Sequence, residues 1–466
     1  MSTHAQAKLV AGSADVIITP PEGTQIIHRV ATDIHDDLHA RVLVFGQGSE
    51  SVAIVGIDFL VLAERYGNEI CARAQELCQI DPKSILLCCS HTHSSPVYGN
   101  FRCWDSGDSR YIEQTVEAIA RAIADAATTM EPIELAYGDF PMQIGYNRRL
   151  HDDGEFLMDR NPDGPVDRRI RVLRIKSQSS GEIRGILFSH GSHPVVIHRS
   201  TSQISADYPG SAATKLLEHY EKASSSFCPV FALGCAGDSN PDVVDGSFAD
   251  LDRIGGYVAW ATQKAVELAT TIERPTLSAR SAKVELPVLE PDLSGAEATI
   301  AACEEERIRL NREIDDPETV ADFPECGIEW SHDLRDLAKG HVSGIPMVVK
   351  VVSFGDELCV VALQAEVFTR YQEIIAEDLH FKNTFVLSCT GGSVGYLPTE
   401  EEFDRGGYEV APTDYTDPRL YAFKYYGTLA LHRECESVTR KAVRDAVDSM
   451  GVNADGSGTK ELGSIG

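Results

Sequence analysis

The stretch Ser84-Ile-Leu-Leu-Cys-Cys-Ser-His-Thr-His-Ser-Ser-Pro96 carries the strongest structural signal in this chain. Residues 85–89 form a short apolar run that predicts a buried strand, and two histidines follow it directly. Side chains two positions apart in an extended segment point to the same side, so His91 and His93 can face one ligand or one metal ion. By itself such a pair is only moderately specific, because core and surface histidines also fall at this spacing. The stretch therefore predicts a strand that ends at a candidate metal site.

The composition is that of a large, acidic, globular protein. The chain has 466 residues, 43% of them hydrophobic, and a net charge of -29. This charge argues against binding to nucleic acid, whose phosphates it would repel, and against adsorption to an anionic membrane. We expect a small-molecule substrate, no nucleic acid partner and no stable membrane association, and self-association into a homo-oligomer stays open.

The N-terminal residues and the cysteines both favour a cytoplasmic location. Residues 1–10 lack the basic region and apolar core of a secretory signal, and no apolar run approaches the length of a membrane span. The twelve cysteines show neither disulfide nor zinc-knuckle spacing, which is typical of reduced thiols. Cys88 and Cys89 lie close enough to His91 to be considered as ligands, but the interior of the expected strand is the favoured place for both.

Strand-like and helix-like segments alternate along the chain, which indicates an α/β fold with a mixed sheet core flanked by helices. Strands are expected at 42–45, 52–57, 85–89, 133–137, 170–175, 183–188, 229–233, 347–354, 357–363 and 384–388. Helices are expected at 63–78, 111–127, 207–219, 251–270 and 426–449. The pattern of strands is interrupted near 290–344 by charged and polar residues, and there we expect a helical excursion that can act as a lid. We expect one domain over 1–450 and a disordered tail at 451–466.

Three further segments place polar residues beside apolar runs. Residues 186–194 end in histidines, and Glu366 follows a buried strand closely enough to need a cation or a donor. A glycine-punctuated loop at 395–409 carries Tyr396 and Tyr408. Each has a plain structural explanation, namely a core histidine, a salt-bridged glutamate and packing tyrosines. These explanations lose weight when all the segments are taken together.

In their order along the chain, these motifs resemble the neutral, non-lysosomal ceramidases and their shorter bacterial relatives, from about residue 10 to residue 448. His91 to Pro96 looks like the HTHSGP motif of that family, and Asn147-Arg148 resembles its NR motif. His193 precedes Ser205-Ala-Asp-Tyr-Pro-Gly210 as a histidine precedes the SGDNKG-like segment of ceramidases. Glu366-Val-Phe is similar to the family's PGEF, and Tyr396 and Tyr408 match its GY and YE loop.

The resemblance implies a catalytic domain that holds one Zn²⁺ per chain. Its zinc ligands would be His91, His193, Glu366 and Tyr396. The residues around the reacting carbonyl would be His93, Arg148 and Tyr408. Two imidazoles and a carboxylate are a usual ligand set for catalytic zinc, and a phenol can add an oxygen ligand. The implied activity is a zinc-dependent amidohydrolase that cleaves a linear N-acyl amide bond through a metal-activated water.

The chain also departs from the family. Gly237-Asp-Ser-Asn-Pro241 looks like the GDVSPN segment of ceramidases, so Asn240 stands where the family has an active-site serine, and Ser239 lies one place before it. We expect Asn240 to bind substrate, and Ser239 stays open as the residue that faces the site. Ceramidases are secreted or membrane-associated and carry a C-terminal immunoglobulin-like domain. We expect neither a signal nor that domain here, which favours a small soluble substrate over a sphingolipid. The cleft is then expected to be short and lined by polar groups of 237–242 and 391–408.

Several other functions stay open. Within the same chemistry, the alternatives are a true ceramidase acting on N-acylsphingosine and a zinc-dependent esterase or lactonase. A degenerate homologue that binds a ligand without turnover is the non-enzyme alternative, although the full set of candidate residues counts against it. An amidohydrolase barrel also opens with two histidines after a strand, but Glu366 and the 391–409 loop do not fit its ligand pattern.

Overall fold

The computed structural model describes residues 7–27, 29–99, 108–152, 155–199, 201–221, 226–289, 344–410 and 422–451, together with 301, 304, 305 and 330. The helices are α1 (Glu64–Cys78), α2 (Ser109–Thr128), α3 (Asp207–Tyr220), α4 (Phe248–Glu267), α7 (Tyr371–Leu379), α8 (Ala422–Tyr425) and α9 (Cys435–Asp448). Short 3₁₀ turns are η1 (Pro82–Ser84) and η3 (Glu400–Asp404).

The longer strands are β1 (Val10–Ile17), β5 (His39–Gln47), β6 (Glu50–Ile57), β7 (Ile85–Cys89), β8 (Glu131–Pro141), β9 (Gly145–Asp152), β10 (Glu155–Asn161), β11 (Arg169–Ser177), β12 (Ile183–Ser189), β14 (Cys228–Phe231), β17 (Leu277–Pro287), β18 (Gly344–Phe354), β19 (Leu358–Leu363) and β21 (Asn383–Leu387). The short strands are β2 (Gln25–Ile26), β3 (Arg29–Val30), β4 (Asp33–Ile34), β13 (Gln203–Ile204), β15 (Ser239–Pro241), β16 (Thr270–Thr271), β20 (Glu366–Val367) and β22 (Tyr396–Leu397).

The largest sheet of the described residues has nine strands. Its order is β14, β12, β11, β8, β1, β5, β6 and β7, with β16 paired to β8. Most neighbours are antiparallel, whereas β7 runs parallel to β6 and β14 runs parallel to β12. Strands β5, β6 and β7 are buried on both faces, which explains why their sequences read as nearly continuous apolar runs. The sheet is therefore mixed, as the sequence predicted.

A second sheet, in the order β17, β18, β19 and β21, packs face to face on the first. Alternation along β5 shows the two faces. Leu43 and Phe45 point to the second sheet, where the ring of Phe45 lies 5.2 Å from that of Phe354 between centroids. Val42 and Val44 point the other way, into the helices. The sequence did not reveal this stacking, because a strand buried on both faces reads alike whatever covers each face.

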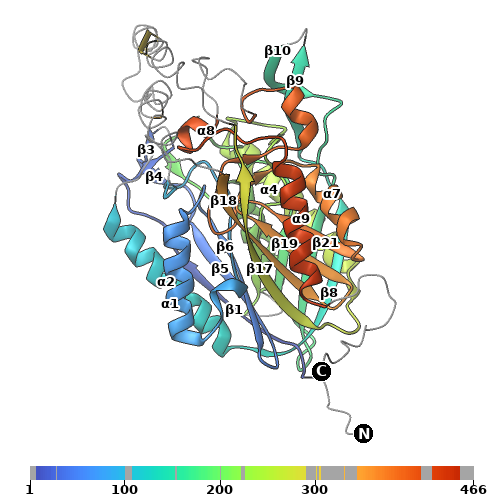
Figure 1. The fold of residues 1–466 in the computed structure, drawn as a ribbon. Coiled ribbons are helices and arrows are strands. Elements are labelled where there is room, and N and C mark those ends of the chain that lie inside the picture. The colour runs from blue at the N-terminus through green and yellow to red at the C-terminus, as the bar shows by residue number, and fades with distance from the viewer. Residues whose placement is uncertain are drawn as a thin grey trace, which may run out of the picture.

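Helices cover the outer faces of both sheets, so the layers run helix, sheet, sheet, helix (Figure 1). Helices α1 to α4 pack on the large sheet, and α7 and α9 pack on the smaller one. Helix α2 illustrates the cause. Its apolar residues Ile112, Val116, Ile119 and Ile123 recur at helical spacing and are buried, and Asp108 caps its first turn. The predicted α/β class with a mixed sheet and flanking helices is confirmed.

The final helix begins later than predicted. It was expected from residue 426 but begins at Cys435, because Gly427 adopts a positive φ of 66° after the short α8. The excursion expected at 290–344 lies, apart from residues 301, 304, 305, 330 and 344, outside the described residues, and so does the tail from 452 onward. The single domain over 1–450 stays a prediction.

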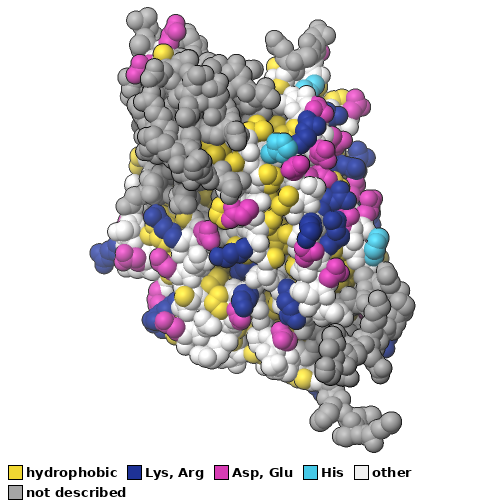
Figure 2. All heavy atoms as spheres, viewed as in Figure 1, with side chains coloured by type: hydrophobic (Ala, Val, Ile, Leu, Met, Phe, Trp, Pro, Cys, Tyr) yellow, Lys and Arg dark blue, Asp and Glu magenta, His cyan; other side chains and the backbone are white. Residues whose placement is uncertain are grey.

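The surface is charged and mixed. On the face drawn in Figure 2, lysines and arginines are interspersed with aspartates and glutamates, most densely around α9. Several charged residues form pairs, such as Arg440 with Asp378 at 2.8 Å. Among the described residues no helix is both long and apolar enough to cross a membrane.

Candidate metal centre

The candidate site lies where strands of both sheets end. Polar residues follow the carboxyl ends of β7, β12 and β19, which is where open α/β sheets usually place ligands. The segment after β21 ties these ends together. The backbone N–H of Ser388 donates to the carbonyl of Leu233 at 2.9 Å, and that of Gly391 donates to Leu87 at 2.7 Å. Residues far apart in the sequence therefore meet at one end of the molecule.

His91 sits directly after β7 in a strained backbone conformation. Its φ of 69° lies in the left-handed region, which costs a non-glycine residue about 1–3 kcal/mol and is concentrated at functional sites. The Nδ1 atom lies 2.8 Å from the carbonyl oxygen of Leu60 and donates to it, which fixes the tautomer. The other nitrogen, Nε2, lies 3.3 Å from Oε2 of Glu366.

His193 approaches the same carboxylate from the loop after β12. Its Nδ1 donates to the carbonyl of Ala236 at 2.7 Å, and its Nε2 lies 3.1 Å from Oε2 of Glu366. The backbone N–H of His193 is held by the carbonyl of Ser239 at 3.0 Å. His190, its neighbour in the predicted histidine segment, turns away and contacts the carbonyl of Arg169 at 3.1 Å. The structure thus brings His193, and not His190, to Glu366.

Strand register aligns Glu366 with Tyr396. The short strands β20 and β22 are parallel, and Glu366 and Tyr396 are direct Cα partners. The N–H of Glu366 donates to the carbonyl of Gly395 at 2.9 Å, which fixes this register. Both side chains are almost fully buried and line one cavity. The two segments that the sequence singled out separately are therefore one structural unit.

The donor set fits a metal ion. Each Nδ1 already donates to a carbonyl, so Nε2 is the nitrogen of each ring that is left to face Oε2 of Glu366. Burial and the charge of Arg148 lower the pKa of His193 to about 4, so its ring is neutral at pH 7. Burial opposes ionisation of Glu366, but its two histidines outweigh burial and hold its pKa well below the usual range. Two Nε2 atoms that converge on one buried carboxylate oxygen form a site that would hold a cation, and N and O ligands suit zinc.

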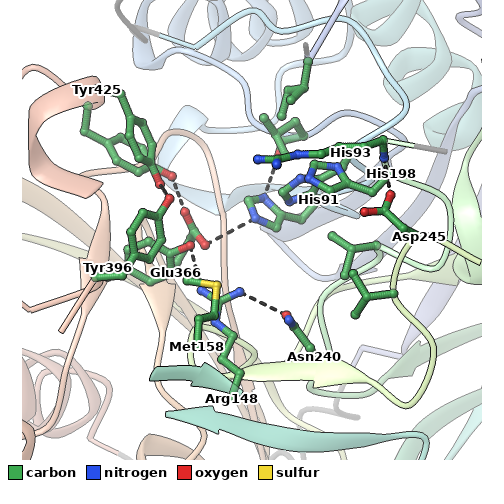
Figure 3. Close-up of a pocket in the computed structure, with 17 residues that line it drawn as sticks. His91, His93, Arg148, Met158, His198, Asn240, Asp245, Glu366, Tyr396 and Tyr425 are labelled. Atoms are coloured by element: carbon green, nitrogen blue, oxygen red, sulfur yellow. Dashed lines mark hydrogen bonds and ion pairs between the residues drawn. The ribbon is translucent and has the colours of Figure 1, made fainter. Parts of the chain in front are cut away.

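His93 lies beside this group (Figure 3). One ligand atom each of His91, His93 and His193 lies within 4.8 Å of the others, so the three histidines also form a candidate metal group. The ring of His93 stands 5.1 Å from that of His91 and 4.8 Å from that of His198 between centroids. The structure therefore places His93 at the metal centre, where it is close enough either to bind the ion or to face the substrate.

Arg148 is fixed at both ends of its guanidinium group. Its Nη2 donates to the Tyr396 hydroxyl at 3.0 Å, and its Nη1 donates to Oδ1 of Asn240 at 3.0 Å. Its Nε donates to Glu409 at 2.9 Å. Burial disfavours the cation, but the hydrogen bond to Tyr396 and the negative charges of Glu409 and Glu366 raise the pKa of Arg148 well above its ordinary value. Arg148 therefore stays positively charged, and Asn240 rather than Ser239 lines the cavity.

A second arginine balances the charge behind Arg148. Successive side chains of β9 alternate, so Arg149 points away from the cavity and pairs with Glu402 at 2.8 Å and with Glu409. Glu402 also pairs with Arg405 at 2.7 Å, so these glutamates are engaged by arginines. Glu366 faces the histidines instead and would balance the charge of a bound cation. The sequence interpretation missed Glu409 as a partner of Arg148, although it follows Tyr408 in the YE motif.

Four tyrosines close one side of the site. Tyr396 and Tyr408 lie 5.9 Å apart between ring centroids, and the hydroxyl of Tyr408 lies 2.5 Å from that of Tyr425. Tyr426 donates its hydroxyl to Oε1 of Glu366. The sequence interpretation missed Tyr425 and Tyr426 because it assigned residue 426 to the final helix. The adjacent pair of tyrosines just before a glycine was the available signal.

These residues surround a cavity of about 330 Å³. Its polar lining includes Asn240, Tyr396 and Tyr408 from the two loops that the sequence predicted. Its apolar lining comes from Ile27, Leu60, Met158, Val195 and Val244. The expectation of a cleft lined by polar groups is therefore only partly right, because the apolar side chains outside those loops were not foreseen.

Asp207, in the segment Ser205 to Gly210, does not line this cavity. It begins α3 with a φ of 54° and accepts hydrogen bonds from the N–H of Ile197 at 2.9 Å and of Tyr208. Burial raises its pKa to about 7, with a smaller contribution from the charge of Asp36. Asp207 therefore supports the loop that follows His193 rather than the chemistry.

A pH-dependent stability follows for Asp207. Its folded pKa of about 7 lies above the ordinary 3.8, so its contribution to stability is fully present below about pH 4 and is lost as pH rises through 7. The loss is on the order of 4 kcal/mol. Asparagine tolerates the left-handed backbone at this position, so we expect Asp207→Asn to fold. Its free energy of unfolding, measured by urea in the presence of a chelator, should not show this decline as pH rises. Equal pH slopes for wild type and variant would contradict the prediction.

Comparisons with known proteins identify a family and a fold. Residues 23–254 match the family described as neutral/alkaline non-lysosomal ceramidase, N-terminal. This range holds His91, His93, Arg148, His193 and Asn240 of the site. No curated protein sequence matches the chain.

Two solved structures share the fold. The crystal structure of neutral ceramidase from Pseudomonas aeruginosa has a TM-score of 0.68 and 17% identity over 96% of this chain and 75% of that one. A ceramidase complexed with C2 has a TM-score of 0.69 and 16% identity over 95% of this chain and 75% of that one. The match over about half of the chain places the protein in the neutral/alkaline non-lysosomal ceramidase family, which supports a ceramidase-like hydrolase of amide bonds.

Proposed function

We propose that the protein is a zinc-dependent hydrolase that cleaves an N-acyl amide bond in a small soluble substrate in the cytoplasm. One observation carries the metal dependence: the buried Nε2 atoms of His91 and His193 both face the same oxygen of Glu366, at 3.3 and 3.1 Å. Family membership supports the amide bond as the reacting group.

The zinc ligands would be His91, His193, Glu366 and the hydroxyl of Tyr396. When bound, zinc lowers the pKa of water and polarises a carbonyl group. Burial and the charge of Glu366 raise the pKa of Tyr396 well above its ordinary value, so the chain offers it as a neutral phenol. The chain itself supplies one carboxylate charge and neutral oxygen and nitrogen atoms to the cation.

Three side chains would act on the substrate. Arg148 and Tyr408 would donate hydrogen bonds to the oxygen that becomes negative as the carbonyl is attacked. Burial raises the pKa of Tyr408, so its hydroxyl keeps its proton at neutral pH. His93 would pass a proton to the nitrogen of the leaving amine. Asn240, which accepts from Arg148, would help to orient both the arginine and the substrate.

The cavity lining supports two substrates of different size. Its volume of about 330 Å³ is at the small end for ligand sites, which favours a compact substrate. The apolar side chains of Ile27, Val195 and Val244 favour N-acylsphingosine as the second candidate, because a long acyl chain gains about 0.8 kcal/mol for each buried CH₂. The two candidates predict opposite dependence on acyl length.

Turnover of matched N-acyl substrates tests the proposal. We expect purified protein to bind about one zinc ion per chain, as the single site requires. We also expect it to hydrolyse a short-chain N-acyl amine at a higher kcat/KM than a long-chain N-acylsphingosine. A clear preference for the long chain would establish the second candidate instead. Hydrolysis of a matched ester but not of the amide would show that the protein is an esterase instead.

A further inference from the structure

We propose that Tyr426 is a positioning residue that holds Glu366 so that only Oε2 faces the metal centre. The inference rests on the proposed metal site. It concerns a residue outside the predicted ligand and catalytic sets, and it assigns Tyr426 a role in metal affinity rather than in contact with the substrate.

The two oxygens of Glu366 have different partners. Oε2 lies 3.3 Å from Nε2 of His91 and 3.1 Å from Nε2 of His193. Oε1 accepts the hydroxyl hydrogen of Tyr426. A carboxylate whose outer oxygen is engaged in this way cannot rotate freely about its terminal bond. Glu366 is thus presented with one oxygen toward the histidines.

The ring of Tyr426 is itself held in place. Gly395 has a φ of 98°, and a Cβ atom added there would lie 3.3 Å from Cδ2 of Tyr426. The absence of a side chain at 395 therefore lets the ring lie directly against the backbone. Gly395 precedes Tyr396 and also bonds the N–H of Glu366, so the tyrosine packs on the turn that sets the register of both candidate ligands.

Tyr425 provides a matched control. It is adjacent in sequence and equally buried, but its hydroxyl contacts that of Tyr408 at 2.5 Å rather than Glu366. Replacing either tyrosine by phenylalanine removes one buried hydroxyl and keeps the ring. A purely structural role of the hydroxyl would lower stability in both variants and would leave metal affinity alone.

Removal of a residue that hydrogen-bonds to a metal ligand typically weakens metal affinity by about 10- to 100-fold. For Tyr426→Phe we therefore expect zinc to bind at least about 10-fold more weakly, measured by competition with a chromophoric chelator. The visible absorption of the cobalt-substituted protein should also change, because the freed carboxylate alters the surroundings of the ion. Tyr425→Phe should keep the wild-type zinc affinity and cobalt spectrum.

Circular dichroism and thermal unfolding of the metal-free proteins check that both variants fold. Tyr426→Leu, which also lacks the hydroxyl, should repeat the loss of affinity if the phenylalanine variant is unstable. Wild-type zinc affinity in a folded Tyr426 variant would overturn the inference and leave the metal centre standing. Absence of zinc binding by the wild-type protein would instead overturn the proposed metal centre itself.

Discussion

Glu366→Gln is expected to abolish zinc binding and activity while leaving the metal-free protein folded. The substitution keeps the shape of the side chain and removes its negative charge. The new amide nitrogen can donate to Nε2 of His91 or His193, which the carboxylate of the metal-free protein cannot do. The neutral ring of His193 then has a donor without a cation, so the variant lacks the charge that would bind zinc and no longer needs zinc to satisfy this contact.

Thermal unfolding with and without zinc measures this effect. A ligand that binds only the folded state stabilises it by about 4 kcal/mol when its concentration is 1,000 times its dissociation constant. We expect that zinc raises the unfolding temperature of the wild type and does not raise that of Glu366→Gln. His91→Ala should behave in the same way, because it removes one of the two imidazoles.

Glu402→Gln is the control for loss of a buried carboxylate. Glu402 is as deeply buried as Glu366, but it pairs with Arg149 at 2.8 Å and does not face the histidines. This variant should lose stability, because it leaves a buried arginine short of a partner, and should still bind zinc. Zinc binding by Glu366→Gln at wild-type affinity would rule out Glu366 as a ligand.

The sequence predicted the elements that depend on local pattern. The strand at 85–89 and the helix after residue 63 were placed to within a residue, because apolar runs and helical spacing are properties of neighbouring positions. The stacking of the two sheets is a contact between elements far apart in the chain. No local pattern distinguishes a strand face covered by a helix from one covered by another sheet.

The same distinction applies to the site. His91, His193 and Glu366 were found because each follows an apolar run, and Arg148 was found because Asn147-Arg148 resembles a motif of the family. The hydroxyl of Tyr426 reaches Glu366 across 60 residues, and Glu409 reaches Arg148 across 261. The carbonyl of Leu60, which fixes the tautomer of His91, is a backbone atom and leaves no trace in the residue type. Such partners become visible only in the folded chain.

Arg148→Ala should keep zinc and lose rate. Removal of one donor to the developing oxyanion typically lowers kcat by about 10²- to 10³-fold. Because Arg148 also orients Tyr396 and Asn240, we expect an effect at the upper end of this range. Tyr408→Phe should lower kcat by a smaller factor, since the Tyr408 hydroxyl is shared between Tyr425 and the substrate and orients no other residue of the proposed site. Steady-state kinetics on zinc-loaded protein should show the change in kcat rather than in KM.

Arg41→Ala separates this effect from the loss of a buried arginine in general. Arg41 is buried on β5, lies 3.7 Å from Asp58, and does not line the cavity. Its removal should lower the unfolding temperature and leave kcat of the folded enzyme near the wild-type value. Full activity of Arg148→Ala would remove Arg148 from the oxyanion-stabilising set. The positive charge of Arg148, 3.5 Å from Nε2 of His193, would then serve to keep that histidine neutral for the metal.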